Sequence, residues 1–287
     1  MIVSPMEYSA TSHPGLLRDN NEDTYLCLPE AGLWLVADGM GGHEAGEVAS
    51  AIVRDTVSQK IKTNPNAELA LSIQAAHRAI LNSAANGIGA IGMGSTVVAL
   101  QSRDKSFQIA WVGDSRAYLW TPDRKGGRLE RLSTDHSYVQ MLVEKGAISP
   151  EEADVHPEKN IITQCLGMQE LEQVAVDLVQ GQWQQNQWIL LCSDGLTDEM
   201  NDQTIAQILS VSDNSLTAVD QLLHAALTNG GHDNITLQII ESPVKPHPFW
   251  LSVKQWIPHI TGNTFFDACL FGATIALLVS SIVSFLF

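Results

Sequence analysis

Apolar residues recur in short alternating or continuous runs along most of this 287-residue chain. Runs of this length, separated by Gly, Pro, Asn and Asp, are typical of β-strands. They predict strands in the stretches TYLCL, LWLVAD, STVVAL, FQIAWVGD, RAYLW, VAVDLV, WILLCSD and ITLQII. Helical periodicity instead predicts helices over about residues 44–62, 66–85, 201–210 and 214–228.

The order of these elements indicates the fold class. Strands and helices are grouped along the chain and do not alternate strictly, which argues against a parallel sheet and favours antiparallel sheets faced by helices. We therefore predict an α+β fold. A polar insertion at about residues 136–167 has a capping box from Ser149 to Glu152, with Pro150 at the first helical position, so we expect it to contain a helix and to cover a site.

The end of the chain has a different pattern. Residues 268–287 contain no charged side chain, and a helix of that length, at about 1.5 Å per residue, spans the roughly 30 Å of membrane hydrocarbon. We predict a transmembrane helix there, since the alternative, a buried core helix, normally has a polar face. The Pro-rich residues 242–267 are predicted to form a linker, either with a short interfacial helix around Lys254 or as a plain spacer, after a folded domain of residues 1–241.

Composition narrows the function classes. The chain has 32 acidic and 16 basic residues, a net charge of -16, which argues against a general nucleic-acid binder because polyanions are repelled. Its four cysteines lack the spacing of zinc sites or disulfide frameworks, which favours a reducing compartment. The N-terminus lacks a secretory signal, and Lys245 and Lys254 precede the apolar segment. We expect a single-pass membrane protein whose folded domain faces the cytoplasm.

Acidic side chains mark the ends of the predicted strands. Three of them close apolar strands and three precede strands, and these are Asp38, Asp114, Asp194, Glu22, Asp23 and Asp233. Where strands of a common sheet end at one rim, such carboxylates converge, and cations offset their repulsion. Oxygen ligands without a nearby cysteine suit Mg²⁺ or Mn²⁺ better than zinc. Each acid alone is more often a turn residue, so the prediction depends on the set.

Six segments in order resemble the metal-dependent serine/threonine protein phosphatases of the protein phosphatase 2C type, in their bacterial form. They are GLLRDNNED at 15–23, VADGMGGHEAGEVAS at 36–50, GMGSTVVAL at 92–100, VGDSRAYL at 112–119, LCSDGLTD at 191–198 and GGHDNIT at 230–236. From the first to the last, these segments span most of residues 7–241. The resemblance implies a four-layer α/β/β/α sandwich with two antiparallel sheets, and hydrolysis of phosphoserine and phosphothreonine in proteins.

The resemblance also implies a metal site. Two Mn²⁺ or Mg²⁺ ions are expected to be held, mostly through water, by Asp23, Asp38, Asp194 and Asp233, with the main-chain oxygen of Gly39 as a further ligand. Glu22 is expected to act through water, and Asp114 with Asp194 to help bind a third, weaker ion. A metal-bridging hydroxide would then attack the phosphorus directly, without a covalent intermediate.

Two further residues receive catalytic roles from the resemblance. Arg18 matches the family's phosphate-binding arginine, and His43 matches the general acid that protonates the leaving alkoxide. In isolation, Arg18 reads as a surface residue and His43 as a solvated loop position. Within DGMGGH, Gly41 and Gly42 permit a tight turn that brings His43 over the site. A helix from about Glu44 is expected to fix that turn by packing on the sheet through Ala45, Val48, Ala49 and Ile52.

The insertion at 136–167 resembles the family's flap and is expected to border the cleft, with His136 and His156 in structural or surface roles. The expected partners are phosphorylated proteins, a serine/threonine kinase or its substrates, and a membrane, without nucleic acid. Two alternatives remain open: a catalytically silent, membrane-tethered scaffold, and a hydrolase of a small phosphate ester. The complete acidic set disfavours the first, and the lack of a P-loop-like glycine loop disfavours the second.

Overall fold

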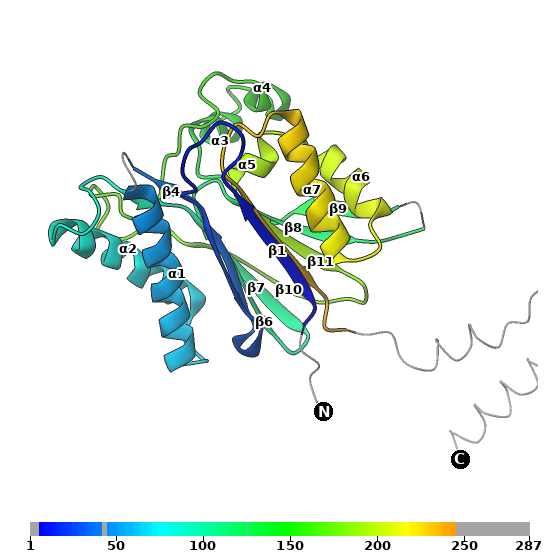
Figure 1. The fold of residues 1–287 in the computed structure, drawn as a ribbon, viewed down its shortest axis with the longest axis horizontal. Helices are drawn as coiled ribbons and strands as arrows, with labels where there is room; N and C mark the ends of the chain where they lie inside the picture. The colour runs from blue at the N-terminus through cyan, green and yellow to red at the C-terminus, as the bar shows by residue number, and fades with distance from the viewer. Residues whose placement is uncertain (1–5, 42–44, 125, 245–287) are drawn as a thin grey trace, which may run out of the picture. The chain divides into compact units, whose positions relative to one another are not determined.

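The computed structural model describes residues 6–41, 45–124 and 126–244 (Figure 1). The chain divides into the units Met1–Lys245 and Pro246–Phe287, and the second unit lies outside the described residues. The predicted transmembrane helix at 268–287 and almost all of the predicted linker lie there too. Among the helices that the structure describes, none is long and apolar enough to cross a membrane.

Two five-stranded antiparallel sheets form the centre of the folded unit. The first has the order β1-β12-β11-β8-β9 and consists of β1 (Tyr8–His13), β12 (Ile235–Glu241), β11 (Trp188–Cys192), β8 (Arg116–Thr121) and β9 (Arg128–Arg131). The second has the order β10-β7-β6-β3-β2 and consists of β10 (Asp177–Gln182), β7 (Ser106–Val112), β6 (Val97–Arg103), β3 (Leu33–Ala37) and β2 (Thr24–Leu28). The two-residue strands β4 (Gly39–Met40) and β5 (Gly94–Ser95) form a separate small pair.

Helices cover the outer face of each sheet (Figure 1). On the second sheet these are α1 (Ala45–Thr63) and α2 (Leu69–Ala85), and on the first sheet α6 (Asp202–Val211) and α7 (Ser215–Asn229). The shorter helices are η1 (Pro29–Ala31), α3 (Tyr138–Glu144), α4 (Pro150–Asp154) and α5 (Asp194–Thr197). The chain thus forms the expected α+β sandwich of two antiparallel sheets flanked by helices.

Alternation along the strands creates three apolar layers. In β3, Leu33 and Leu35 point toward α1 and α2, whereas Trp34 and Val36 point toward the other sheet. The same alternation places Leu190 of β11 under α6 and α7, with its neighbours on the opposite face in the layer between the sheets. Burial of both faces explains why these strands read as continuous apolar runs.

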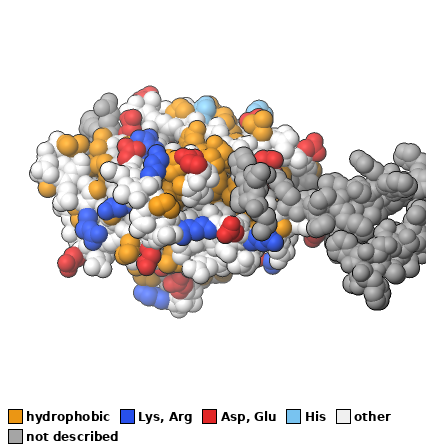
Figure 2. Space-filling model, turned by 90° about the horizontal axis from the view of Figure 1, so that it is seen from below, with side chains coloured by type: hydrophobic (Ala, Val, Ile, Leu, Met, Phe, Trp, Pro, Cys, Tyr) orange, Lys and Arg blue, Asp and Glu red, His pale blue; other side chains and the backbone are white. Residues whose placement is uncertain are grey.

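The two ends of the sandwich differ in what they expose. Loops and the short helices α3, α4 and α5 lie at the upper end in Figure 1. The opposite end, seen from below in Figure 2, shows acidic and basic side chains interspersed around a hydrophobic area. Because neither charge sign dominates that visible face, its electrostatics give no reason to place a strongly charged ligand there.

Most predicted elements are confirmed, and the differences involve polar or short segments. The predicted strand VAVDLV is displaced, because the observed β10 starts three residues later, at Asp177. Strands β1 and β9 were not predicted, since YSATSH and RLER are too polar to show a clear apolar alternation. The capping box at Ser149 is confirmed: its hydroxyl accepts a bond from Glu152 N, and the Glu152 carboxylate accepts one from Ser149 N.

Tyr118→Phe tests how α6 is attached to the first sheet. The buried Tyr118 hydroxyl donates to the Asp202 carboxylate at the start of α6 at 2.8 Å. We expect the substitution to lower the free energy of unfolding by about 1 kcal/mol, the usual net value of such a bond. Thermal unfolding should show a melting temperature about 2–4 °C lower. The half-exposed Tyr25 provides the control, and an equal loss in Tyr25→Phe would contradict this attachment.

Candidate active site

The predicted carboxylates collect at one end of the sandwich, but they come from both sheets. Asp38 directly follows β3, and Asp114 follows β7 after one glycine, so these two extend from the second sheet. Asp194 follows β11 of the first sheet and begins α5. Asp23 precedes β2 and Asp233 precedes β12, in different sheets. The carboxylates therefore converge at one rim as expected, but they come from the ends of two sheets and not of one common sheet.

These carboxyl groups share one poorly solvated environment. Burial raises the pKa of Asp23 to about 8 and that of Asp194 to about 6. Burial also raises the pKa values of Asp38 and Asp114 well above their usual range. Repulsion adds to burial, and the Asp38 carboxyl is affected by Asp23, Asp194, Asp114 and Asp233 together. Carboxylates arranged in this way become more stable when cations offset their charge.

The donor set fits hard divalent cations. Asp114 Oδ1 and Asp194 Oδ1 are buried and have no hydrogen-bond partner among the described residues, so each has free coordination capacity. No three described His, Cys, Asp or Glu side chains lie close enough to enclose one ion directly. Carboxylate oxygens are the ligands that Mg²⁺ and similar hard ions prefer.

Ser193 and Thr236 hold Asp23 in place, and the sequence reasoning missed both. Ser193 Oγ donates to Asp23 Oδ2 at 2.8 Å and accepts from Thr236 N at 3.0 Å. These bonds connect β2 of one sheet to β11 and β12 of the other, and hydrogen bonding partly counteracts the rise in the Asp23 pKa. The sequence clue to both residues is a polar side chain within an apolar strand segment: Ser193 in WILLCSD and Thr236 in ITLQII. The structure shows that both side chains are buried.

Asn234 fixes the loop that contains Arg18 and Glu22. Its Nδ2 donates to Pro14 O at 3.0 Å and to Asn20 O at 2.9 Å, and its Oδ1 accepts from Glu22 N at 2.7 Å. One side chain therefore fastens both ends of the loop to the start of β12. Sequence reasoning read only the preceding Asp233 as functional and overlooked this amide.

Glu22 and Gly39 lie where β4 packs against α1. Gly39 N donates to Glu22 O at 3.2 Å, and Ser50 Oγ donates to the same oxygen at 2.6 Å. A Cβ atom on Gly39 would lie 2.0 Å from Gly46 O, and one on Gly46 would lie 2.6 Å from Glu22 Cδ. Both glycines are thus required for close packing, a role that for Gly39 adds to its expected main-chain ligation. Burial raises the pKa of Glu22.

The turn after β4 is described only in part. Gly41 adopts a φ of +154°, a conformation that suits glycine, but Gly42, His43 and Glu44 lie outside the described residues. The predicted role of His43 therefore stays a prediction. The helix that follows packs as expected, through buried Ala45 and Ala49 and partly buried Val48 and Ile52.

Arg18 lies at the acidic rim. Its Nη2 is 2.7 Å from Asp233 Oδ2, while its side chain is 54% exposed and Asp233 is 37% exposed. The negative charge of Asp233 raises the Arg18 pKa further, so the guanidinium remains positively charged. Arg18 thus forms a salt bridge with the predicted metal ligand Asp233, and more than half of the Arg18 side chain remains exposed to solvent.

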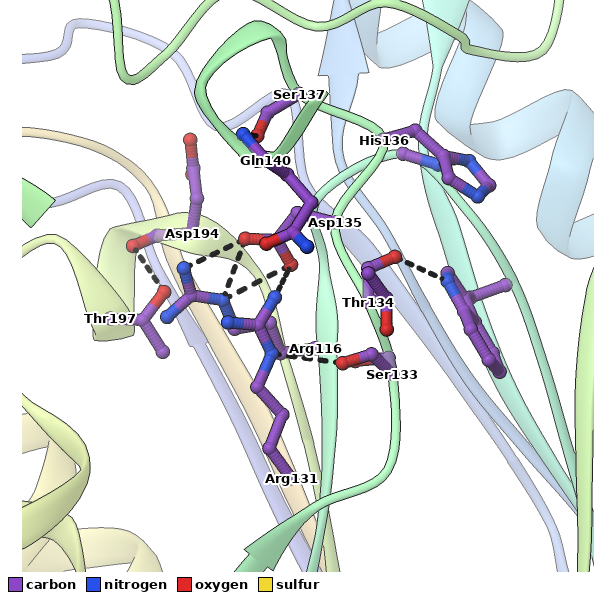
Figure 3. A network of polar contacts seen from close by, with 12 residues as sticks. Arg116, Arg131, Ser133, Thr134, Asp135, His136, Ser137, Gln140, Asp194 and Thr197 are labelled. Atoms are coloured by element: carbon purple, nitrogen blue, oxygen red, sulfur yellow. Dashed lines mark hydrogen bonds and ion pairs between the residues drawn. The ribbon is translucent and has the colours of Figure 1, made fainter. Parts of the chain in front are cut away.

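A cleft of about 670 Å³ opens beside Asp114 and Asp194. Helices α3 and α4 supply one side of its lining, and α5 with the start of α6 supplies another. In Figure 3 the guanidinium groups of Arg116 and Arg131 both point toward the Asp135 carboxylate. Arg116 Nη2 lies 2.8 Å from Asp135 Oδ2, and Arg131 also contacts this carboxylate.

The insertion borders the cleft and is bonded to the loop of Asp114. His136 N donates to Gly113 O at 2.9 Å, and His136 Nδ1 accepts from Gly113 N at 3.1 Å. His136 is therefore structural, as expected. His156 lies at the surface of the insertion, where its Nδ1 accepts from Glu158 N and its ring contacts Tyr138. Through His136, the insertion and Asp114 form one connected unit.

Asp38→Asn tests whether this carboxylate cluster binds cations. Mn²⁺ at about 100 times its dissociation constant should stabilise the wild-type chain by about 2.7 kcal/mol, or about 5–10 °C in melting temperature. The variant should lose most of that increase yet be no less stable without metal, because one repelling charge is removed. Thermal unfolding with and without Mn²⁺ measures both. Asp55→Asn, at a 68% exposed position, is the control, and an undiminished Mn²⁺ effect in Asp38→Asn would contradict the assignment.

Comparison with known proteins agrees with this geometry. The protein phosphatase 2C family model matches residues 18–229. The serine/threonine protein phosphatase PstP of Mycobacterium tuberculosis is 35% identical over 240 residues, a match that covers 82% of this chain but only 45% of that relative. The serine/threonine phosphatase stp of Listeria innocua is 34% identical over 238 residues, covering 79% of this chain and 92% of the relative.

A solved structure is also similar. The crystal structure of the PstP catalytic domain in complex with two manganese ions superposes with a TM-score of 0.71 at 33% identity, covering 82% of this chain and 97% of that one. The match of the family model to most of the folded unit, together with relatives above 30% identity, shows that this chain belongs to the protein phosphatase 2C family.

Proposed function

We propose that this chain is a metal-dependent phosphatase that hydrolyses phosphoserine and phosphothreonine in proteins. The observation that supports this most strongly is the buried carboxylate cluster, in which Asp114 and Asp194 each have an oxygen without a hydrogen-bond partner among the described residues and also line an open cleft. Family membership and the named activities of the relatives agree with it. The chain spans less than half the length of PstP. Its substrates and partners are therefore proposed from the geometry of its own carboxylate cluster and cleft, and not from those of PstP.

Each ligand role is proposed from its place at the rim. Asp23, Asp38, Asp194 and Asp233, with the main-chain oxygen of Gly39, would hold two Mn²⁺ or Mg²⁺ ions, largely through water. Glu22 would act through water, and Asp114 with Asp194 would hold a third, weaker ion. When bound, such ions acidify water and neutralise the charge of a phosphate monoester.

Arg18 would bind and orient the phosphate. A guanidinium offers parallel N–H donors that match two phosphate oxygens, and Arg18 keeps more than half of its side chain accessible. The bond to Asp233 holds the guanidinium at the rim before substrate arrives. We propose His43 as the group that donates a proton to the departing serine or threonine oxygen, since an unprotonated alkoxide is a poor leaving group.

We also propose that residues 268–287 anchor the protein in a membrane, with residues 1–241 as a cytoplasmic catalytic domain and residues 242–267 as the linker. The direction of β12 is compatible with this, because Asp233 precedes the strand and Val244 follows it. At about 3.3 Å per residue, the chain leaves the strand about 20 Å from the acidic rim. The site would then remain open to phosphorylated cytosolic proteins, among them a serine/threonine kinase or its substrates.

The primary test is hydrolysis of a phosphothreonine peptide by the full-length chain in detergent with Mn²⁺. We expect turnover that chelation abolishes and that Asp38→Asn reduces at least about 100-fold, because loss of a metal function removes several kcal/mol of transition-state stabilisation. Hydrolysis that persists in Asp38→Asn, or that is indifferent to chelation, would refute the proposal. Metal binding without any hydrolysis would favour the silent scaffold instead.

Arg18→Ala tests the phosphate role separately. A hydrogen bond to a charged group contributes about 1.5–3 kcal/mol, so kcat/KM for a phosphopeptide should fall about 10- to 100-fold. The Mn²⁺ dependence of the melting temperature should persist. Arg78→Ala, at an exposed position on α2, serves as the control. An Arg18→Ala enzyme with wild-type kcat/KM would contradict the assignment.

The anchor is tested by fractionation of the native cells. We expect the full chain to sediment with membranes and a chain ending at residue 267 to remain in the supernatant, since removing a roughly 20-residue apolar span removes the insertion energy. Protease added to intact cells should spare the folded domain, and protease added to lysates should digest it. A full-length chain found only in the supernatant would contradict the anchor.

A further inference from the structure

We infer that the cleft between α4 and the start of α6 selects phosphopeptides that have a lysine or arginine close to the phosphorylated residue. This inference rests on the proposed function and specifies its substrate class. Three features of the cleft lead to it: its continuity with the carboxylate cluster, the pairing of both its arginines with one buried carboxylate, and the acidic character of its outer lining.

The inner end of the cleft is part of the candidate active site. Asp114 and Asp194 both line it, and each has a buried Oδ1 atom without a hydrogen-bond partner among the described residues. Asp114 is only 8% exposed, so its carboxylate is largely shielded from bulk solvent. A peptide whose phosphate is held at this end therefore has flanking residues within reach of the cleft lining.

The arginines of the lining are already committed to protein groups. Arg116 and Arg131 both contact the carboxylate of Asp135, which is 9% exposed (Figure 3). Arg131 Nε also donates to Ser133 O at 2.9 Å. Taking these guanidinium groups away from Asp135 to bind an acidic substrate residue would leave a buried carboxylate unpaired, which is costly. That cost disfavours the use of these two arginines to bind acidic substrate residues.

The outer lining is acidic and only partly compensated. It contains Asp154 and Asp202, together with Asp198. Lys159 is the counterion of Asp198, since its Nζ lies 2.9 Å from Asp198 Oδ1. Asp202 accepts a bond from the neutral Tyr118 hydroxyl, and the exposed Asp154 carboxylate forms no hydrogen bond or ion pair with any described residue. A cationic side chain would offset this excess negative charge.

Because Asp154 and Asp202 are exposed to solvent, their preference for a basic substrate residue is expected to be moderate. Interactions between solvent-exposed charges are weak individually and are screened by salt, so the preference should be moderate and ionic-strength dependent. Two acidic residues facing one cation, combined with their repulsion of an acidic residue, should favour a lysine-flanked over a glutamate-flanked phosphopeptide about five- to tenfold in kcat/KM.

The experiment compares two phosphothreonine peptides that differ only in lysine or glutamate at the flanking positions, with the full-length chain and Mn²⁺. The readout is the ratio of the two kcat/KM values, which does not depend on the fraction of folded enzyme. We expect Asp154→Lys to lower the ratio about three- to tenfold, and Asp202→Asn, which keeps an acceptor for Tyr118, to lower it about twofold. Asp220→Lys on α7, an exposed acidic residue outside the cleft, should leave the ratio unchanged.

The outcomes separate the inference from the proposed function. Equal hydrolysis of both wild-type peptides, or equal ratios in Asp154→Lys and Asp220→Lys, would overturn the inference while the phosphatase activity stands. Failure of the wild-type chain to hydrolyse either peptide, or para-nitrophenyl phosphate, would overturn the proposed function itself. A lysine preference that disappears in 0.5 M salt and in Asp154→Lys would support the inference.

Discussion

Electrostatic repulsion among buried carboxylates is the constraint on which the rest of this structure depends. Asp23, Asp38, Asp114 and Asp194 have raised pKa values because protein surrounds them and because they repel one another. Such an arrangement opposes folding at neutral pH unless cations join it. We therefore expect the fold to become more stable when cations bind at this rim.

The surrounding structure holds these charges together from two directions. The rim lies where the ends of two sheets meet, and polar bonds cross between the sheets at that point, through Ser193 to Asp23 and through Asn234 to the Arg18 loop. Because neither Gly39 nor Gly46 has a side chain, β4 can pack closely against the start of α1. Buried apolar layers on both sides of each sheet stabilise the fold, and this stabilisation offsets the repulsion among the carboxylates.

Much of this could be predicted from the sequence, and the failures have physical causes. Strands such as LWLVAD were recognisable because both of their faces are buried, and the candidate acids because each lies at or near a strand end. Strands β1 and β9 were missed because polar residues occupy much of them. The supporting roles of Ser193 and Asn234 depend on contacts with Asp23 and Glu22, which lie 170 and 212 positions away, respectively, and no local pattern reveals them.

In the proposed function, ions at the acidic cluster and Arg18 would hold the phosphate, and the outer acids of the cleft would act on the flanking peptide. The most direct test is a crystal structure of the protein with Mn²⁺, with the ions located by anomalous scattering. The account predicts two neighbouring anomalous peaks among Asp23, Asp38, Asp194 and Asp233. Peaks that lie elsewhere, or an unoccupied rim at saturating Mn²⁺, would contradict it.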